Sequence, residues 1–340
     1  MTEAPPGLDL GRLAAWLPAA LPEAGPELSA TLLAGGKSNL TYEVTDSVAT
    51  WVLRRPPLGH VLATAHDMAR EYRVMSALAG TAVPVPAMYA LCEDTEVLGV
   101  PFYVMERVAG TPYRHAAQLQ ALGPERTRAI ALDMVDTLAA LHRVDPAAVG
   151  LSDFGKPGGF LARQVSRWKK QLDASWCRDL PAADELHKRL AADIPEQSAP
   201  GIVHGDYRLD NILIGPDDEL NAVIDWEMAT LGDPLTDLAL MLVYHRLGDQ
   251  LGGGTVADAA SAPGFPSERE VIERYARGSD RDLTRIGFYL GLASYKLAVI
   301  LEGIHYRYQH GQTVGPGFEN IGPAIYPLLD AGLSALKEYT

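Results

Sequence analysis

The chain has 340 residues, 47% hydrophobic and 21% charged, and this composition excludes an intrinsically disordered protein. Its length is long for one core and favours two lobes or domains. A formal net charge of −14 argues against a nucleic-acid partner, which would need a basic surface; it would suit a cationic substrate, although solubility is the commoner reason for it.

The cysteine content and the apolar runs narrow the class further. Cys92 and Cys177 are too few and too far apart for a disulfide framework or a zinc site, so we expect buried, reduced thiols. No basic segment precedes an apolar one after Met1, which predicts no signal peptide, and apolar runs such as 238–244 are shorter than a membrane span. We expect a cytoplasmic protein with no membrane partner; its oligomeric state cannot be read from the sequence.

The first third of the chain is predicted to be rich in β-strand. An amphipathic helix over residues 8–21 precedes three short β-rich runs, a second helix and two further strands. These runs are Leu28–Leu33, Thr41–Thr45 and Trp51–Arg54, followed by the helix Ala65–Leu78 and the strands Ala87–Leu91 and Phe102–Val108. The order β-β-β-α-β-β does not fit a doubly wound βαβ unit.

After residues 110–112 the pattern becomes mainly helical. Residues 124–143 begin with a proline and repeat apolar residues at helical spacing. Further helices are predicted at Phe160–Leu172, Ala182–Leu190, Leu235–Leu247, Glu268–Arg277, Leu283–Tyr308 and Ile321–Tyr339. Residues 249–266, rich in small residues, are predicted to form a loop.

The stretch from Ile202 to Asp237 carries the densest chemistry. Two short apolar runs, 212–214 and 222–224, flank Gly215-Pro216-Asp217-Asp218, which is strong turn chemistry and predicts an antiparallel hairpin.

Three oxygen-bearing side chains lie near the open end of this hairpin. Asn211 precedes the first strand, Asp225 follows the second, and Asp206 stands five residues before Asn211 (211 − 206 = 5). We expect the three to converge on a site suited to Mg²⁺, which prefers hard oxygen ligands. The alternative is that they are turn residues of an ordinary α/β domain.

The motif resembles a known family. His-Gly-Asp at 204–206, followed by Asn211 and then by Asp225 14 residues later (225 − 211 = 14), is similar to the kinase catalytic loop and its metal-binding aspartate. I-D-W-E and G-D-P-x-x-D-L resemble the aminoglycoside phosphotransferase and choline kinase family. H-G-D-Y-R-L-D-N, V-L-R-R-P-P and W-E-M-A-T-L-G-D-P look most like the subgroup related to the kinase-like domain fused to some acyl-CoA dehydrogenases. The resemblance covers most of residues 30–310.

This resemblance implies a bilobal, protein-kinase-like α+β fold. A β-rich lobe, residues 1–107 with the N-terminal helix, would bind the nucleotide, and a mainly helical lobe, residues 108–340, would carry catalysis and the acceptor. Asp206 would accept or orient the proton of an acceptor hydroxyl, while Asn211 and Asp225 would hold Mg²⁺. His204 is expected to brace the loop, and Asp233 and Asp237 to act as structural anchors.

ATP would contact the first lobe at several points. Between the first two strands, Gly36, Ser38 and Asn39 permit close backbone approach and offer donors to phosphates, although a plain hairpin turn is the alternative. A P-loop is excluded because Thr31 stands where its first glycine is required and a strand follows.

The resemblance also assigns a cation on the third strand and a hinge. Arg54 stands where most kinases carry lysine, with Glu71 as its helix partner and Arg55 as the solvent-facing alternative. A surface charge pair is the competing explanation for Glu71. Glu106 and Val108 would meet adenine through main-chain groups.

The acceptor is the least specified part. Tyr207 and Arg208 would face the pocket or brace the loop, and Glu302 is a candidate substrate contact on the late helix, with a structural role open for each. Arg163, Arg167 and Trp168 lie on one possible helix face, where a core or surface role is at least as well supported as ligand contact for each. Arginines would suit an anionic acceptor such as a hydroxy acid or acyl thioester, and acidic residues an aminoglycoside or choline.

The sequence therefore predicts an ATP-dependent kinase that phosphorylates a hydroxyl of a small molecule. The subgroup favours a hydroxyacyl acceptor. The alternatives are an aminoglycoside or choline-like amino-alcohol kinase, a catalytically silent kinase-like binding module, and a metal-dependent phosphohydrolase using His204, Asp206 and Asp225.

Overall fold

The computed structural model describes residues 5–33, 39–58, 66–251, 258–313, 318–319 and 321–338. The chain forms two compact units: Met1–Gly110 with Asn221–Ala229, and Thr111–Leu220 with Thr230–Thr340. This division differs from the predicted one at residue 107 because a short later segment packs with the first unit. There the backbone N–H of Val223 donates to the Pro84 carbonyl at 2.8 Å.

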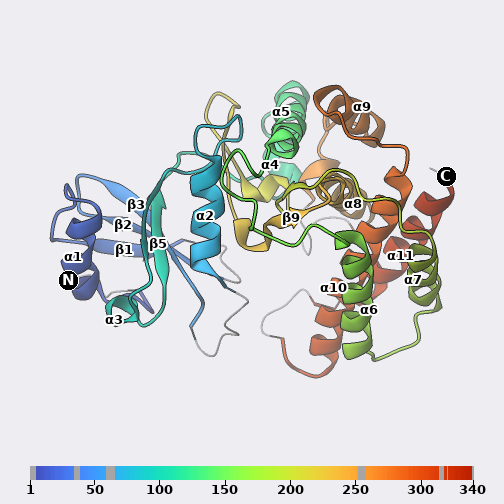
Figure 1. Cartoon of the computed structure of the whole chain (residues 1–340), viewed down its shortest axis with the longest axis horizontal. Coiled ribbons are helices and arrows are strands. Elements are labelled where there is room, and N and C mark those ends of the chain that lie inside the picture. The colour runs from blue at the N-terminus through green and yellow to red at the C-terminus, as the bar shows by residue number, and fades with distance from the viewer. Residues whose placement is uncertain are drawn as a thin grey trace. The chain divides into compact units, whose positions relative to one another are not determined.

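The first unit is a five-stranded antiparallel sheet with one helix on each face (Figure 1). The strand order is β1-β2-β3-β5-β4, built from β1 (Ser29–Leu32), β2 (Leu40–Thr45), β3 (Thr50–Arg55), β4 (Met88–Cys92) and β5 (Phe102–Glu106). The helices are α1 (Leu10–Ala20) and α2 (Met68–Leu78), and a short α3 (Thr95–Leu98) joins β4 to β5. The predicted β-rich lobe is confirmed.

Strand alternation decides what each face of this sheet carries. Leu13 and Leu17 of α1 join the core cluster that contains Trp51 and Leu53 of β3. Because successive side chains of a strand point to opposite faces, Arg54 lies on the face covered by α2. Arg55 therefore shares the α1 face, where it is 5% exposed.

The second unit is mainly helical, as predicted. Its helices are α4 (Ala116–Gln120), α5 (Pro124–Arg143), α6 (Phe160–Ala174), α7 (Pro181–Ala192), α8 (Leu235–Leu251), α9 (Glu268–Gly278), α10 (Ile286–Gln309) and α11 (Ile321–Glu338). Helix α10 packs against α6, α7, α8 and α11 (Figure 1). Its length and apolarity would suffice to cross a membrane, but 83% of its most apolar window is buried inside the structure, as expected of a core helix.

Short strands place the catalytic motif within this helical unit. β6 (Gly201–Val203) pairs antiparallel with β9 (Thr230–Gly232). The backbone hydrogen bonds between these two strands therefore fix the start of the loop after β6 and of the segment after β9. Two single-turn helices, η1 (Leu209–Asn211) and η3 (Ala259–Ser261), belong to this unit, and η2 (Trp226–Met228) to the first. β7 (Ile212–Ile214) ends in a turn in which the Gly215 N–H donates to the Glu219 carbonyl at 2.8 Å, and β8 (Leu220–Val223) follows.

We expect Gly264→Ala to destabilise the second unit far more than Gly150→Ala. Both glycines have positive φ, +93° and +73°, which costs an alanine about 1–2 kcal/mol. A Cβ on Gly264 would also lie 2.1 Å from the backbone oxygen of Pro124, whereas one on Gly150 meets no atom within 4 Å. The clash should add about 1–3 kcal/mol. Urea unfolding checks this, and equal losses for the two variants would contradict it.

Candidate active site

The loop that follows β6 is fixed by one buried carboxylate on α8. The backbone N–H groups of His204 and Gly205 donate to the two carboxylate oxygens of Asp237, at 2.6 and 2.8 Å. Gly205 has a φ of +89°, a conformation that a side chain would strain. The Asp206 N–H donates to Nδ1 of His204 at 3.2 Å. His204 thus braces the loop rather than facing solvent, in keeping with its 0% exposure.

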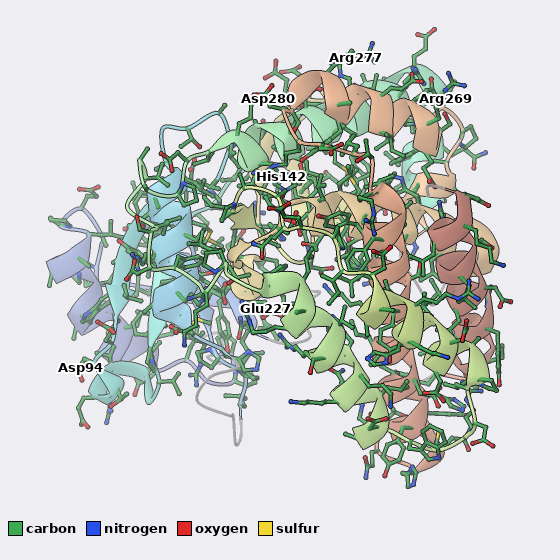
Figure 2. All side chains as sticks on the ribbon, turned by 45° about the vertical axis from the view of Figure 1, so that its right-hand side comes forward. Asp94, His142, Glu227, Arg269, Arg277 and Asp280 are labelled. Atoms are coloured by element: carbon green, nitrogen blue, oxygen red, sulfur yellow. The ribbon has the colours of Figure 1, made fainter. Side chains whose placement is uncertain are left out.

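Asp237 is contacted by His142 of α5, which in turn contacts Tyr275 of α9. Figure 2 shows His142 in the interior of the second unit, where its Nε2 lies 3.5 Å from Asp237 and its Nδ1 2.7 Å from the hydroxyl of Tyr275. Burial lowers the pKa of His142 and keeps the ring neutral at pH 7. Burial alone would raise the pKa of Asp237, but its hydrogen bonds with His142 and Gly205 lower it, so the carboxylate remains ionised.

Asp206 receives hydrogen bonds from two directions. The Tyr244 hydroxyl donates to one carboxylate oxygen at 3.1 Å, and Nδ2 of Asn211 donates to the other at 3.1 Å and to the Asp206 carbonyl at 2.9 Å. Burial and the neighbouring Asp206 raise the pKa of Tyr244, which therefore keeps its proton. These hydrogen bonds hold the Asp206 carboxylate, which is 29% exposed, in a fixed orientation. A general base needs that geometry.

Of the predicted acceptor contacts, Tyr207 points into the core and Arg208 into a pocket. The Tyr207 hydroxyl donates to the Met134 carbonyl at 2.8 Å, and the side chain is 0% exposed. Arg208 pairs with Asp210 at 2.6 Å, lies 3.5 Å from Asp206 and stacks 5.0 Å from the Tyr244 ring centroid.

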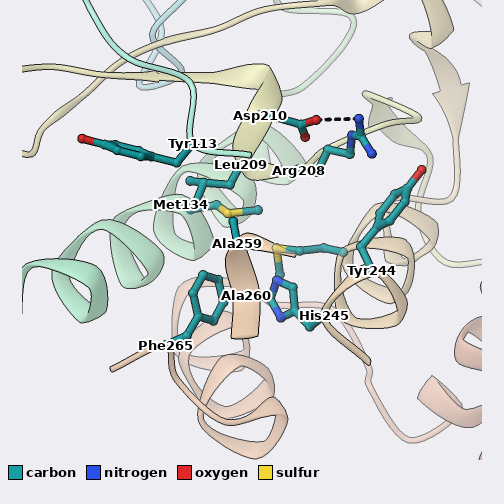
Figure 3. Close-up of a pocket in the computed structure, with 11 residues that line it drawn as sticks. Tyr113, Met134, Arg208, Leu209, Asp210, Tyr244, His245, Ala259, Ala260 and Phe265 are labelled. Atoms are coloured by element: carbon teal, nitrogen blue, oxygen red, sulfur yellow. Dashed lines mark hydrogen bonds and ion pairs between the residues drawn. The ribbon is translucent and has the colours of Figure 1, made fainter. Parts of the chain in front are cut away.

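The pocket beside Arg208 is mostly apolar (Figure 3). Its empty volume is about 350 Å³, including the part open to solvent, and it is lined by Tyr113, Met134, Arg208, Leu209, Asp210, Met241, Tyr244, His245, Ala259, Ala260 and Phe265. Because Arg208 and Tyr244 also touch Asp206, the pocket borders the candidate base.

Glu302, the third predicted contact, is buried and occupied by other groups. Its carboxylate accepts hydrogen bonds from Arg178 at 2.7 Å and from the Cys177 thiol at 3.0 Å. The Glu302 side chain is 1% exposed. These contacts favour a structural role that ties the segment after α6 to α10. A substrate contact at Glu302 stays a prediction.

In the first unit, Arg54 of β3 is surrounded by acidic side chains. It lies 3.2 Å from Glu71 of α2 and 3.8 Å from Glu227, and it donates to Asp225. Tyr103, the cross-strand partner of Arg54, donates its hydroxyl to Glu71 at 2.9 Å. Burial raises the pKa of Glu71 to about 7 and Arg54 opposes this shift.

Asn39 completes this cluster. Its Nδ2 donates to Glu71 at 2.9 Å and to Glu227 at 3.1 Å, and its Oδ1 lies 2.7 Å from Nδ1 of His66. The amide is 1% exposed. The structure thus links Asn39 to the Arg54–Glu71 pair, and its contact with phosphate stays a prediction. Gly36 and Ser38 lie outside the described residues.

The expectation that Arg55 faces solvent is wrong. Its guanidinium donates to the Gly7 carbonyl, and it lies 3.4 Å from the Leu98 carbonyl under α1. The predicted hinge residues make main-chain contacts of their own: the Glu106 N–H donates to the Ala87 carbonyl at 2.8 Å, and the Val108 carbonyl accepts from Arg107 at 2.9 Å.

Two further candidate site residues, Tyr244 and Lys296, were not predicted from the sequence. Tyr244 stands seven residues after Asp237 on α8 (244 − 237 = 7), which puts both on one helix face. Lys296 interrupts the apolar pattern of α10, and its Nζ donates to the Gly205 carbonyl at 2.9 Å. A heptad spacing from the anchor, and a lone charge in an apolar helix, are signals that could have identified them.

The predicted magnesium ligands are divided between the two units. Asn211 contacts Asp206 in the second, and Asp225, 29% exposed, pairs with Arg54 in the first. Because Nδ2 of Asn211 is committed to Asp206, its carbonyl oxygen is the group left for a cation. Within the described ranges no three His, Cys, Asp or Glu side chains gather as a metal cluster. The convergence of Asp206, Asn211 and Asp225 stays a prediction.

Acid should destabilise the protein partly through His245, which packs edge-on against Phe265 with ring centroids 4.7 Å apart. Burial lowers the pKa of His245 from 6.5 to about 4. Between these values the unfolded chain binds a proton that the folded chain does not, so stability falls as pH falls through this window. His245→Leu should show a smaller drop in Tm between pH 7 and pH 5 than the wild type. His310→Leu, at an exposed site, is the control, and equal drops in all three would contradict this assignment.

Similarity to known proteins identifies the family of this chain. Residues 29–275 match the APH family, described as the phosphotransferase enzyme family. The chain is 35% identical to human acyl-CoA dehydrogenase family member 11 over 340 residues, covering 97% of this chain but 43% of that protein. It therefore spans less than half the length of this curated relative.

Two solved structures share the fold. An aminoglycoside phosphotransferase-like protein from Ralstonia eutropha JMP134 is 36% identical, with a TM-score of 0.85 covering 97% of this chain and 98% of that one. The aminoglycoside phosphotransferase APH(4)-Ia, solved as a thermostable mutant with AMP-PNP and hygromycin B, is 18% identical, with a TM-score of 0.60 over 93% and 97% of the two chains. The catalytic-loop motif, the kinase-like fold and the sequence match over residues 29–275 agree, and the chain belongs to the APH phosphotransferase family.

Proposed function

We propose that this protein is an ATP-dependent kinase that transfers the γ-phosphoryl group to a hydroxyl of a small molecule. The observation that carries the proposal is the Asp206–Asn211 pair on a loop whose backbone is fixed by Asp237. The Asp206 carboxylate, held by the hydrogen bond that Tyr244 donates to it, can accept or orient a hydroxyl proton. In phosphoryl transfer, most of the catalysis is positioning and electrostatics, which such a rigid loop supplies.

Mg²⁺ is the cation that these side chains would suit. The free carbonyl oxygen of Asn211 and the half-buried carboxylate of Asp225 are hard ligands of the kind that magnesium prefers. The bound ion would neutralise charge on the transferred phosphoryl group. Each of the two side chains is held by contacts within its own unit, Asn211 by Asp206 and Asp225 by Arg54.

The first unit supplies the groups proposed to bind ATP. Arg54 is anchored by Glu71 and Asp225, as a cation placed to meet phosphates would need to be. Support for ATP comes from the fold shared with the APH(4)-Ia structure, which contains AMP-PNP.

We further propose a hydroxyacyl compound as the acceptor. Support comes from the 35% identity to human acyl-CoA dehydrogenase family member 11, whose name refers to acyl-CoA. The apolar pocket beside Arg208 and Tyr244 is consistent with a hydrocarbon portion next to the reacting hydroxyl.

A panel of acceptors tests the proposal. ADP release should depend on an added 3- or 4-hydroxyacyl compound and should be weaker with aminoglycosides and choline-like amines. A coupled ADP assay together with mass spectrometry of the acceptor measures this. ADP release with none of the acceptors would indicate a silent binding module, and phosphate release without an acceptor would indicate a phosphohydrolase.

The carboxylate assigned as base gives a second test. Asp206→Asn removes the proton acceptor but keeps the side-chain size, so kcat should fall by about 10²–10⁴-fold. Asp217→Asn, at an exposed position of the turn after β7, is the matched control and should keep wild-type turnover. Similar kcat values for the two variants would remove Asp206 from the reaction.

A further inference from the structure

Helix α10 carries a lysine where its neighbours are buried and apolar. Residues 286–295 and 297–299 of this helix are buried, and Lys296 between them is only partly exposed. A lysine side chain carries a positive charge and three donors, so its burial is unfavourable unless those donors find partners.

The ammonium group of Lys296 lies beside the loop of the candidate base. Its Nζ donates to the carbonyl of Gly205 at 2.9 Å, one residue before Asp206. It also lies 5.7 Å from the ring centroid of Trp168 on α6. Burial lowers the pKa of Lys296, whereas the charges of Asp206 and Asp237 raise it.

No described carboxylate lies within 4.0 Å of this ammonium group: Asp206 and Asp237 act on it only at longer range. Other cations of the chain are compensated directly, as Arg54 is by Glu71 at 3.2 Å and Arg178 by Glu302 at 2.7 Å. Lys296 thus keeps donors that one backbone carbonyl does not saturate.

A second cation shares the same aromatic ring. The guanidinium carbon of Arg167 lies 5.4 Å from the ring centroid of Trp168, and the side chain is exposed. Among the described residues Arg167 has no ion pair, and its charge lowers the pKa of Lys296. Two positive groups therefore lie near the Trp168 ring in a chain with a net charge of −14.

We propose that Lys296, with Trp168 and Arg167 beside it, binds a carboxylate of the acceptor whose hydroxyl is placed at Asp206. The inference rests on the proposed kinase function and narrows its substrate to hydroxy acids. A carboxylate brought close to Asp206 would be repelled by that charge, and the ammonium group of Lys296 compensates for it.

The test compares a hydroxy acid with the neutral amide of the same carbon skeleton. Lys296→Met keeps the aliphatic stem and removes the charge. It should raise the KM for the acid about 10- to 100-fold, the range expected for losing a hydrogen bond to a charged group, and leave the KM for the amide nearly unchanged. Arg167→Met should raise the KM for the acid only a few-fold, because exposed charges interact weakly.

Calorimetric binding of the acid and the amide, measured without turnover, keeps this result separate from the kinase assay. Lys296→Met should lose affinity for the acid alone, and Lys296→Arg, which keeps the charge, should retain most of it. Lys170→Met, an exposed lysine on α6, is the control and should bind both compounds as the wild type does.

Two results would overturn the inference. One is an equal fall in kcat for acid and amide at unchanged KM, which would make Lys296 only a support for the Gly205 carbonyl. The other is wild-type protein that binds the acid no better than the amide. Selective binding of the acid without phosphorylation would instead support the carboxylate site and count against the proposed kinase function.

Discussion

Two backbone N–H groups bound to one buried carboxylate set the position of everything at the candidate base. Asp237 has two oxygens, and each accepts from a different residue of the loop, His204 and Gly205. An ionised acceptor makes stronger hydrogen bonds than a neutral one, and removing it would leave two buried donors without partners. The ionised Asp237 therefore stabilises the loop in the conformation that Gly205 permits.

Helix α8 extends this control to the reacting carboxylate. Asp237 and Tyr244 lie two turns apart on one face, so the helix that fixes the loop backbone also fixes one oxygen of Asp206. Asn211 holds the other oxygen through an amide on the same loop. Side chains that share rigid supports lose little freedom when a ligand binds, which is the basis of preorganisation.

In the first unit, several acidic side chains share one buried cation, Arg54. Three carboxylates, Glu71, Asp225 and Glu227, approach one guanidinium. Arginine suits this place because its donors are spread over a planar fork: Nε faces Glu71 while Nη2 faces Asp225 and Glu227. A lysine would offer a single nitrogen. The departure from the usual kinase lysine therefore matches the number and spread of acidic partners around β3.

Local patterns predicted much of the fold. The helix expected at 124–143 is α5 with the same bounds, because proline at its start and a regular apolar stripe are both local signals. The strands of the first unit fall within one or two residues of expectation. The pairing of β6 with β9 was not predicted, since each has three residues and its partner is 29 residues away (230 − 201 = 29).

Partners distant in sequence limited the prediction of the site. The motif spacing identified Asp206 and Asn211, and the structure brings them into contact. The spacing of residues in the sequence could not show that Glu302 would contact Arg178, 124 residues earlier. Nor could it show that the segment before α1 would cover Arg55. The alternation of side chains along β3 correctly placed Arg54 on the same face as Glu71. Which segment covers the opposite face, where Arg55 lies, depends on tertiary packing, and residue spacing does not encode that packing.

The segment 221–229 packs with the β-rich unit although more than a hundred residues of the helical unit precede it in the chain. Its ties there include the Arg70 side chain, which donates to the Ala229 carbonyl at 3.1 Å. During synthesis on the ribosome, the amino-terminal unit thus emerges long before its last piece. Until then Glu71 and Arg54 would lack Asp225 and Glu227, and the nascent unit would carry an incomplete charge cluster. The β-rich unit can therefore be completed only after residues 111–220 of the helical unit have been synthesised.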